Sequence, residues 1–317
     1  MGRVMKHARS SFLALLAAQC ALGVPGRAQT AAGAVLRIGS TPNDSYAEPF
    51  YAADQGFFAR DGLNVNVQPF ATGAAVTQAL AGGAIDVGVT NPISLANAVE
   101  HGVAFQFFAA AATYNPAEIA LCVLADAPIH TARDLNGKTI GTTAIKDSNS
   151  LHIVAWMDQN GGDSSTIQLV ELPFSAMAPA IRRGTVAAAP IAEPALSAAM
   201  KEGGLRILSH PMDVYGQHFM VGGYFARTEY IAANVPLLRR LRATIYSTAG
   251  WANSHPDESA AILAKYSKMD PAVLRTMNRA PYGTALTPEM LQPYLNFGYK
   301  YKYIGKQLYA TDLIAKL

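Results

Sequence analysis

Cysteine is almost absent from this sequence, with two residues, Cys20 and Cys122, in 317. Only Cys122 lies outside the N-terminal segment, so the remaining chain can form no internal disulfide. Cys122 sits in the apolar run Ile119–Leu124, which predicts a buried structural thiol rather than a nucleophile. Charged residues are also scarce at 15%, while half of the chain is hydrophobic, which excludes a disordered chain. These figures indicate a compact globular protein.

The sequence motifs of common catalytic and cofactor sites are missing as well. The chain has no HExxH, CxxC, GxSxG or GxGxxG. Gly137-Lys138-Thr139 resembles the end of a phosphate-binding loop, but Ala132 stands where that loop needs glycine. The seven histidines are scattered and show no metal-ligand spacing. We therefore expect no metal, no cofactor and no catalytic residue, although sequence alone leaves a Ser-His-Asp arrangement open.

The N-terminus is typical of a secretory signal peptide. Three basic residues within the first nine precede the apolar segment Ser11–Val24, which is shorter than the ~20 residues of a membrane-spanning helix. Gly26-Arg27-Ala28 supplies small residues for a cleavage site. We expect residues 1–28 to be removed by cleavage near Ala28 and the protein to be periplasmic; the alternative is a buried N-terminal helix.

Removal of this segment changes the charge of the protein. Residues 1–28 carry four of the 25 basic residues and none of the 22 acidic ones, which leaves 21 against 22 and a net charge of −1. A near-neutral chain gives no indication of nucleic-acid binding. Cys20 could anchor a lipoprotein, but Gln19 beside it fits the required cleavage pattern poorly.

Hydrophobic periodicity predicts alternating strands and helices in two blocks. The turn residues between them favour short connections, so we predict an α/β protein with mostly parallel sheets flanked by helices. The expected strands are 36–39, 63–67, 85–89, 104–111 and 119–124, then 139–142, 167–171, 186–191 and 205–208. The expected helices include 47–59, 74–81, 176–183 and 196–200, and beyond Met220 the chain is expected to be mostly helical, at 236–255, 256–266, 271–279 and 288–301.

Three polar turns follow strands in these blocks. Asn91 can cap a helix whose first residue is Pro92, and the following peptide N–H groups would then face the carboxyl edge of the sheet. The loops Thr41–Tyr46 and Thr143–Ser150 occupy equivalent places. Open α/β sheets bind ligands at this edge, and helix N-termini favour anions. A ligand site and simple capping of buried helices both remain open.

Four stretches of the sequence have the order and spacing of a known family. They are Pro49–Val65, Gly83–Gly88, Asp134–Gly141, and Ile181–Ala188 with Glu193-Pro194. In these stretches the chain resembles the periplasmic substrate-binding proteins of ABC importers, in the branch that takes nitrate, sulfonates, taurine and thiamine-pyrimidine precursors. The resemblance covers roughly residues 36 to 230.

The resemblance implies a two-lobed periplasmic-binding-protein fold with two crossing hinge strands. One lobe would contain residues 36–123 plus 221–317 and the other residues 124–220. The crossing segments would lie near Cys122–Ala125 and Phe219–Gly223. Ligand would contact both lobes only when they close, so binding would shift the open–closed equilibrium.

The resemblance also implies where the ligand binds. By the family's pattern the contacts lie at Ser45, Tyr46, Thr90, Asn91, Ser148, Asn149, Glu193, Tyr215 and His218. Lys146 is the one lysine in the expected cleft loops and is either an anion clamp or a solvated surface residue. Ala188, where the family usually has aspartate, and the loop Lys146–Asn149, where it has Gly-Ser, put the family's commonest ligands in doubt.

The function implied is that of a monomeric, non-enzymatic receptor. It would capture a small organic anion, a sulfonate or carboxylate that can be aromatic, and deliver it to a membrane permease with its ATPase. The alternative is an enzyme of the same fold in thiamine-pyrimidine or menaquinone synthesis. Such enzymes are generally cytoplasmic, and the pyrimidine-forming ones use a cysteine-rich segment and a lysine for pyridoxal phosphate, which an exported chain with one remaining cysteine does not fit. A two-lobed sensor domain is a third possibility.

Overall fold

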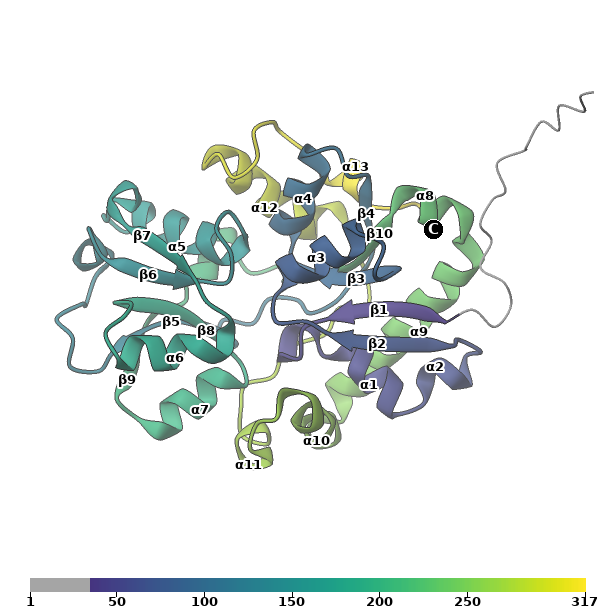
Figure 1. Cartoon of the computed structure of the whole chain (residues 1–317), viewed down its shortest axis with the longest axis horizontal. Coiled ribbons are helices and arrows are strands. Elements are labelled where there is room, and N and C mark those ends of the chain that lie inside the picture. The colour runs from purple at the N-terminus through teal and green to yellow at the C-terminus, as the bar shows by residue number, and fades with distance from the viewer. Residues whose placement is uncertain (1–34) are drawn as a thin grey trace, which may run out of the picture.

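The computed structural model describes residues 35–317, and the expected signal peptide and Cys20 lie outside the described residues. The described chain forms two five-stranded sheets, each covered by helices, which lie side by side in Figure 1. None of the helices within residues 35–317 combines the length and apolar character needed to cross a bilayer.

The first sheet, on the right in Figure 1, has the strand order β2-β1-β3-β10-β4. Strand β1 pairs in parallel with β2 and β3, whereas β10 is antiparallel to both β3 and β4. The strands are β1 Leu36–Ser40, β2 Val65–Pro69, β3 Val87–Thr90, β4 Phe105–Ala110 and β10 Gly223–Arg227. The helices between them are α1 Glu48–Asp54, α2 Phe57–Arg60, α3 Gly73–Ala81 and α4 Pro92–Glu100, with the short 3-10 helix η1 Asp44–Tyr46.

The second sheet has the strand order β7-β6-β8-β5-β9. Strand β6 is parallel to β7 and β8, and β5 is antiparallel to β8 and β9. The strands are β5 Ile119–Leu124, β6 Thr139–Thr142, β7 Gln168–Glu171, β8 Ala188–Ala192 and β9 Leu205–Ser209. The helices are α5 Ser148–Gln159, α6 Phe174–Arg182 and α7 Ala195–Glu202, with 3-10 turns η2 Ala132–Leu135, η3 Ser164–Thr166 and η4 Pro211–Tyr215. Mostly parallel sheets were predicted, and both sheets confirm this.

The antiparallel strand of each sheet is the one that follows a crossing from the other sheet. The chain crosses first between Ala110 and Ile119, and returns between Ser209 and Gly223. Strand β5 therefore belongs to the second sheet, which corrects the expected lobe limit at residue 123 and the expected crossing near Cys122–Ala125. An apolar run buried on both faces looks the same in either sheet, so its sequence gave no signal for this assignment.

The C-terminal helices complete the first lobe and reach the second. Helix α9 packs on α1, and α12 packs on both α4 and α5, so α12 touches both lobes. These helices are α8 Thr228–Ala233, α9 Val235–Ser254, α10 Pro256–Ser267, α11 Pro271–Leu274, α12 Pro288–Lys300 and α13 Ala310–Leu313. The helix expected over 271–279 ends at Leu274, and the one expected over 47–59 divides at Gly56, whose positive φ of 71° interrupts it.

Two crossing segments and one C-terminal segment run together between the lobes. The Ala111 N–H donates to Gly222 O at 2.9 Å, and the Val221 N–H donates to Ala112 O at 2.8 Å. A third segment joins them through the Thr113 N–H, which donates to Pro281 O at 2.8 Å. The junction is thus a small backbone network, in which the segment Phe219–Gly223 takes part.

Candidate ligand-binding site

An enclosed cavity of about 30 Å³ lies between the two lobes, and we call it the inner cavity. Its walls come from the loops after β1 and β6, the starts of α3, α4 and α5, and helix α12. A cavity of this size holds about two water molecules. The lining residues are Thr41, Asn43, Ser45, Tyr46, Gly73, Asn91, Ile119, Thr143, Ser148, Asn149, His152, Phe174, Met212, Val221 and Tyr294.

The loop after β1 is shaped by its own hydrogen bonds. Asn43 caps the η1 turn by accepting from the Tyr46 N–H at 3.1 Å, and the Ser40 hydroxyl donates to Tyr46 O at 2.7 Å. The Tyr46 hydroxyl reaches the return crossing and donates to Val221 O at 3.3 Å. The Ser45 hydroxyl donates to the buried Glu118 carboxyl. This network fixes three cavity side chains of the first lobe.

Asn91 joins the two lobes at the start of α4. Its Oδ1 accepts from the Ser94 N–H at 2.8 Å, which is the predicted helix cap, and also from the Ser148 hydroxyl at 2.8 Å. Ser148 belongs to α5 of the second lobe, so this bond joins the two lobes directly. A second contact beside it runs from Asn97 Nδ2 to Lys146 O at 2.6 Å.

The start of α5 is occupied by the chain itself. The Asp147 carboxylate caps this helix by accepting from the Ser150 N–H at 3.0 Å and from the Thr143 hydroxyl. Burial raises the pKa of Asp147 to about 6, against the opposing effect of these hydrogen bonds. We expected free peptide N–H groups at the helix starts to hold the ligand. The caps Asn91 and Asp147 each take up one of these groups, the Ser94 N–H and the Ser150 N–H, so these two are not free for a ligand.

An aromatic wall closes the inner cavity on the α12 side. The ring of His152 lies 5.2 Å from that of Tyr215 and 5.9 Å from that of Tyr294, centroid to centroid. Burial lowers the pKa of His152 to about 3, so its imidazole is neutral near pH 7. The wall therefore presents polar atoms without charge.

A second, more apolar pocket of about 220 Å³ adjoins the inner cavity, and we call it the outer pocket. The two share Thr41, Asn43 and Phe174 as walls. The other walls come from both lobes and include Pro42, Phe70, Pro173 and Met269. Together the two spaces form a compact polar end with an apolar continuation.

Five of the ten predicted site residues line the inner cavity: Ser45, Tyr46, Asn91, Ser148 and Asn149. The other five do not line it. The Thr90 hydroxyl lies next to it but donates to Gly73 O at 3.0 Å, and Tyr215 stands behind His152 in the aromatic wall. Lys146 and His218 are exposed to solvent, so the structure does not place the expected lysine as an anion clamp.

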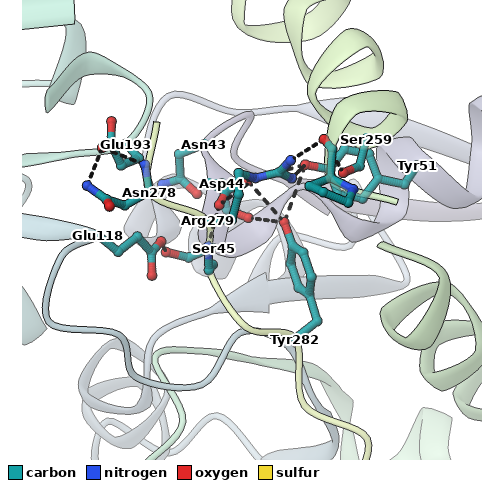
Figure 2. Close-up of polar contacts among 12 residues, drawn as sticks. Asn43, Asp44, Ser45, Tyr51, Glu118, Glu193, Ser259, Asn278, Arg279 and Tyr282 are labelled. Carbon is teal, nitrogen blue, oxygen red and sulfur yellow. Dashed lines mark hydrogen bonds and ion pairs between the residues drawn. The ribbon is translucent and has the colours of Figure 1, made fainter. Parts of the chain in front are cut away.

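Glu193 lies at the junction of the lobes, where it lines the outer pocket but not the inner cavity. Its carboxylate accepts from the Ser197 N–H at 2.9 Å and hydroxyl at 2.7 Å, and from the Asn278 N–H at 3.3 Å. Figure 2 shows this carboxylate bonded to Asn278 beside the buried Asp44–Arg279 ion pair, in which Arg279 Nε lies 3.0 Å from Asp44 Oδ1. These bonds satisfy Glu193 structurally and tie the loop after β8 to the C-terminal segment.

Sequence reasoning missed most of the remaining cavity residues. Thr41, Asn43 and Thr143 lie in loops that the strand-to-helix turns had marked, so a whole-loop prediction would have included them. His152 is one turn beyond the start of α5, where helical spacing brings it to the cavity side of Ser148 and Asn149. No local signal marked Tyr294, because it lies in α12, about 200 residues after Asn91 along the chain.

Within residues 35–317 no group of three or more His, Cys, Asp or Glu side chains could hold a metal ion. Two lobes of this topology around an enclosed polar cavity define the periplasmic-binding-protein fold. Comparison with known proteins gives the family: the NMT1/THI5-like model matches residues 43–259, and the chain belongs to that family.

Relatives of known sequence and structure agree with this assignment. A provisionally named binding protein of Brucella abortus is 26% identical over 242 residues, covering 76% of this chain and 73% of its own. A provisionally named aliphatic sulfonates-binding protein of Escherichia coli is 29% identical over 196 residues, covering 62% of this chain and 60% of its own. The alkanesulfonate-binding protein of Xanthomonas axonopodis bound to MOPS superposes with a TM-score of 0.77 at 21% identity, covering 90% of this chain and 99% of its own.

The nitrate-binding protein of Synechocystis shares the same fold. It has a TM-score of 0.71 at 13% identity, with 85% of this chain and 82% of its own covered. At such identities the likeness concerns the fold, and the ligand of this chain must be argued from its own cavity.

Proposed function

We propose that this protein is an extracytoplasmic receptor of an ABC importer, which captures a small organic anion and delivers it to a membrane permease. The observation that carries the proposal is the inner cavity, which is walled by both lobes and lined by hydroxyls, side-chain amides and one neutral imidazole, together with the apolar side chains of Ile119, Phe174, Met212 and Val221. A ligand there contacts both lobes only in the closed form, so its binding stabilises closure.

The two adjoining spaces support an organic anion rather than a bare inorganic one. The polar inner cavity suits a compact acidic head group, and the apolar outer pocket suits a carbon body. The N-terminus of α4, capped by the uncharged Asn91, adds a favourable potential for one negative charge. No lysine or arginine is among the lining residues of the inner cavity, so a second negative charge would have no counterion.

The partners and the compartment follow from the same proposal. The closed, ligand-bound form would dock on a membrane permease whose ATPase supplies the energy, and the receptor would act as a periplasmic monomer. The binding-protein relatives named above favour this reading over an enzyme of the same fold.

A thermal-shift screen tests the ligand class. The panel contains alkanesulfonates, aromatic carboxylates, nitrate and pyrimidines, since a ligand that binds only the folded protein raises its melting temperature by mass action. At a concentration of 100 times Kd the stabilisation is about 2.7 kcal/mol. We expect a rise with a sulfonate or a carboxylate. Stabilisation by pyrimidines alone, or by nothing in the panel, would contradict the proposed class.

A further inference from the structure

Three polar atoms at the inner cavity have no hydrogen-bond partner on the described chain: Thr41 Oγ1, His152 Nε2 and Tyr294 Oη. Their residues are 5%, 3% and 0% exposed, and all three line the inner cavity. They come from three separate elements, the loop after β1, helix α5 and helix α12. Buried polar atoms are normally paired, so three unpaired ones around one cavity point to a ligand.

The three groups share one chemical property, which is that each can donate a hydrogen bond without carrying a charge. Thr41 and Tyr294 offer hydroxyls, and a neutral imidazole with its proton on Nε2 offers an N–H. Two amide oxygens at the cavity are already engaged: Asn91 Oδ1 accepts from Ser94 and Ser148, and Asn43 Oδ1 accepts from Tyr46. What remains suits a ligand group that is rich in acceptor oxygens.

Packing holds these donors in place. The Tyr215 ring packs against both of the other aromatic residues, with its centroid 5.2 Å from that of His152 and 4.4 Å from that of Tyr294. His152 belongs to the second lobe and Tyr294 to the first, so the donors converge only when the lobes are closed. The buried Asp147 carboxylate lies close to the cavity, because it accepts a hydrogen bond from the cavity residue Thr143. Its negative charge disfavours an additional negative charge on the ligand.

We propose that Thr41, His152 and Tyr294 bind the oxygen atoms of a singly charged head group, a sulfonate or a carboxylate, and that the cavity discriminates against doubly charged oxyanions. This inference rests on the proposed function as an organic-anion receptor and adds the groups that recognise the head. In this proposal Lys146 does not contact the ligand, and helix α12 contacts it through Tyr294.

The test compares two tyrosine variants by calorimetry with 1-butanesulfonate, benzoate and sulfate, and by melting temperature without ligand. Tyr294→Phe removes only the unpaired hydroxyl. The matched control Tyr224→Phe removes an equally buried hydroxyl, which donates to Glu48 at 3.3 Å in the core of the first lobe. Thr41→Val, a change of similar shape, provides a second variant at the cavity.

The expected results separate ligand recognition from structure. Tyr294→Phe and Thr41→Val leave the melting temperature of the unliganded protein unchanged and raise Kd for the bound sulfonate or carboxylate about 10-fold. Tyr224→Phe lowers the melting temperature and leaves Kd unchanged. Sulfate binds the wild-type protein at least about 100-fold more weakly than the organic anion does.

Three outcomes would overturn the inference. If the wild-type protein binds an organic anion and both cavity variants keep its Kd, the donors are misassigned while the proposed function stands. Sulfate binding as tightly as 1-butanesulfonate would refute the charge discrimination. If the wild-type protein binds neither 1-butanesulfonate nor benzoate, the organic-anion function itself fails and this inference fails with it.

Discussion

At the scale of single residues, the junction between the lobes is unusually rich in buried acids. Glu118 is 1% exposed and accepts from the Ser45 hydroxyl, so it lies against the wall of the inner cavity. Burial raises the pKa of Glu118 to about 8, and the neighbouring charges of Asp44 and Glu193 raise it further. Near pH 7 this carboxyl is largely protonated and uncharged, so it does not repel an anionic ligand.

The raised pKa makes a prediction about stability. Between pH 4.5 and 8 Glu118 is ionised in the unfolded chain but protonated in the folded one, so the free energy of unfolding falls as the pH rises through this window. Glu118→Gln keeps the acceptor for Ser45 and cannot ionise. We expect the melting temperature of the wild-type protein to fall relative to that of Glu118→Gln between pH 5 and 8. Parallel profiles would contradict a buried, protonated Glu118.

The Asp44–Arg279 ion pair makes a second prediction at this scale. Asp44 is fully buried, and it also accepts from the Ala280 N–H at 2.5 Å. Removal of the Arg279 cation would leave this buried carboxylate without an opposite charge. Arg279→Met is expected to destabilise the protein by about 3–5 kcal/mol in urea denaturation. The control Lys265→Met removes the exposed pair with Asp54 and should cost less than about 1 kcal/mol. Equal effects would mean that the pair does not hold the loop after β1.

The role of a single residue was predictable where its neighbours in the sequence determine it. Asn91 follows a buried strand and precedes proline, and it caps α4 as predicted. Lys146 was chosen for its charge alone, and its exposed position depends on the local turn, where its own φ is +60°. Tyr294 becomes a cavity residue only through tertiary packing of α12, which no local pattern encodes.

At the scale of elements, the start of α4 has two separable roles. Asn91 caps the helix and also accepts the Ser148 hydroxyl from the other lobe. Asn91→Ala should lower stability by about 1 kcal/mol and also weaken ligand binding, because it removes a bond that belongs to the closed form. Thr72→Ala removes the corresponding cap of α3, which serves Ala75 within the first lobe, and should lower stability alone. Calorimetry and melting curves on both variants distinguish the two roles, and similar Kd values for both would contradict the cross-lobe one.

The return crossing packs so closely at Gly222 that a side chain there would meet its neighbours. A Cβ on Gly222 would lie 2.4 Å from Tyr46 Cε1 and 2.9 Å from Thr90 O. Gly222→Ala should therefore cost about 1–3 kcal/mol in urea denaturation and displace Tyr46 from the cavity wall. Gly250→Ala in α9 meets nothing within 4 Å and should be neutral or stabilising. A stable Gly222→Ala variant with unchanged ligand affinity would refute this close packing.

Element type was predictable from periodicity, but sheet membership was not. The strands and helices of the two blocks were largely predicted, because apolar residues recur at the periods that each element needs. Strand β10 was missed, since its sequence Gly-Tyr-Phe-Ala-Arg is short and adjoins a helical region. Its place between β3 and β4, like that of β5 in the second sheet, is set by crossings that link distant segments.

At the scale of the whole molecule, the lobes are held closed by contacts on two sides of the cavity. Ser148 and Asn91 meet on one side, and on the other the Asp44 N–H donates to Glu193 O at 3.3 Å. Further contacts across the junction join Asn97 to Lys146, Glu193 to Asn278 and α12 to α5, so a change between open and closed forms would have to break or rearrange them. The family resemblance predicted two lobes, and the sheets confirm them; the position of the first crossing had to come from the structure.

Hydrogen–deuterium exchange with and without the best anion of the thermal-shift panel tests the central claim most directly. If the ligand closes both lobes around the inner cavity, the segments 41–46 of the first lobe and 143–150 of the second gain protection together, with 219–222 at the return crossing. The remote strand β7 and helix α8 should not change. Protection confined to one lobe, or appearing away from these segments while calorimetry reports binding, would contradict a ligand held between the lobes.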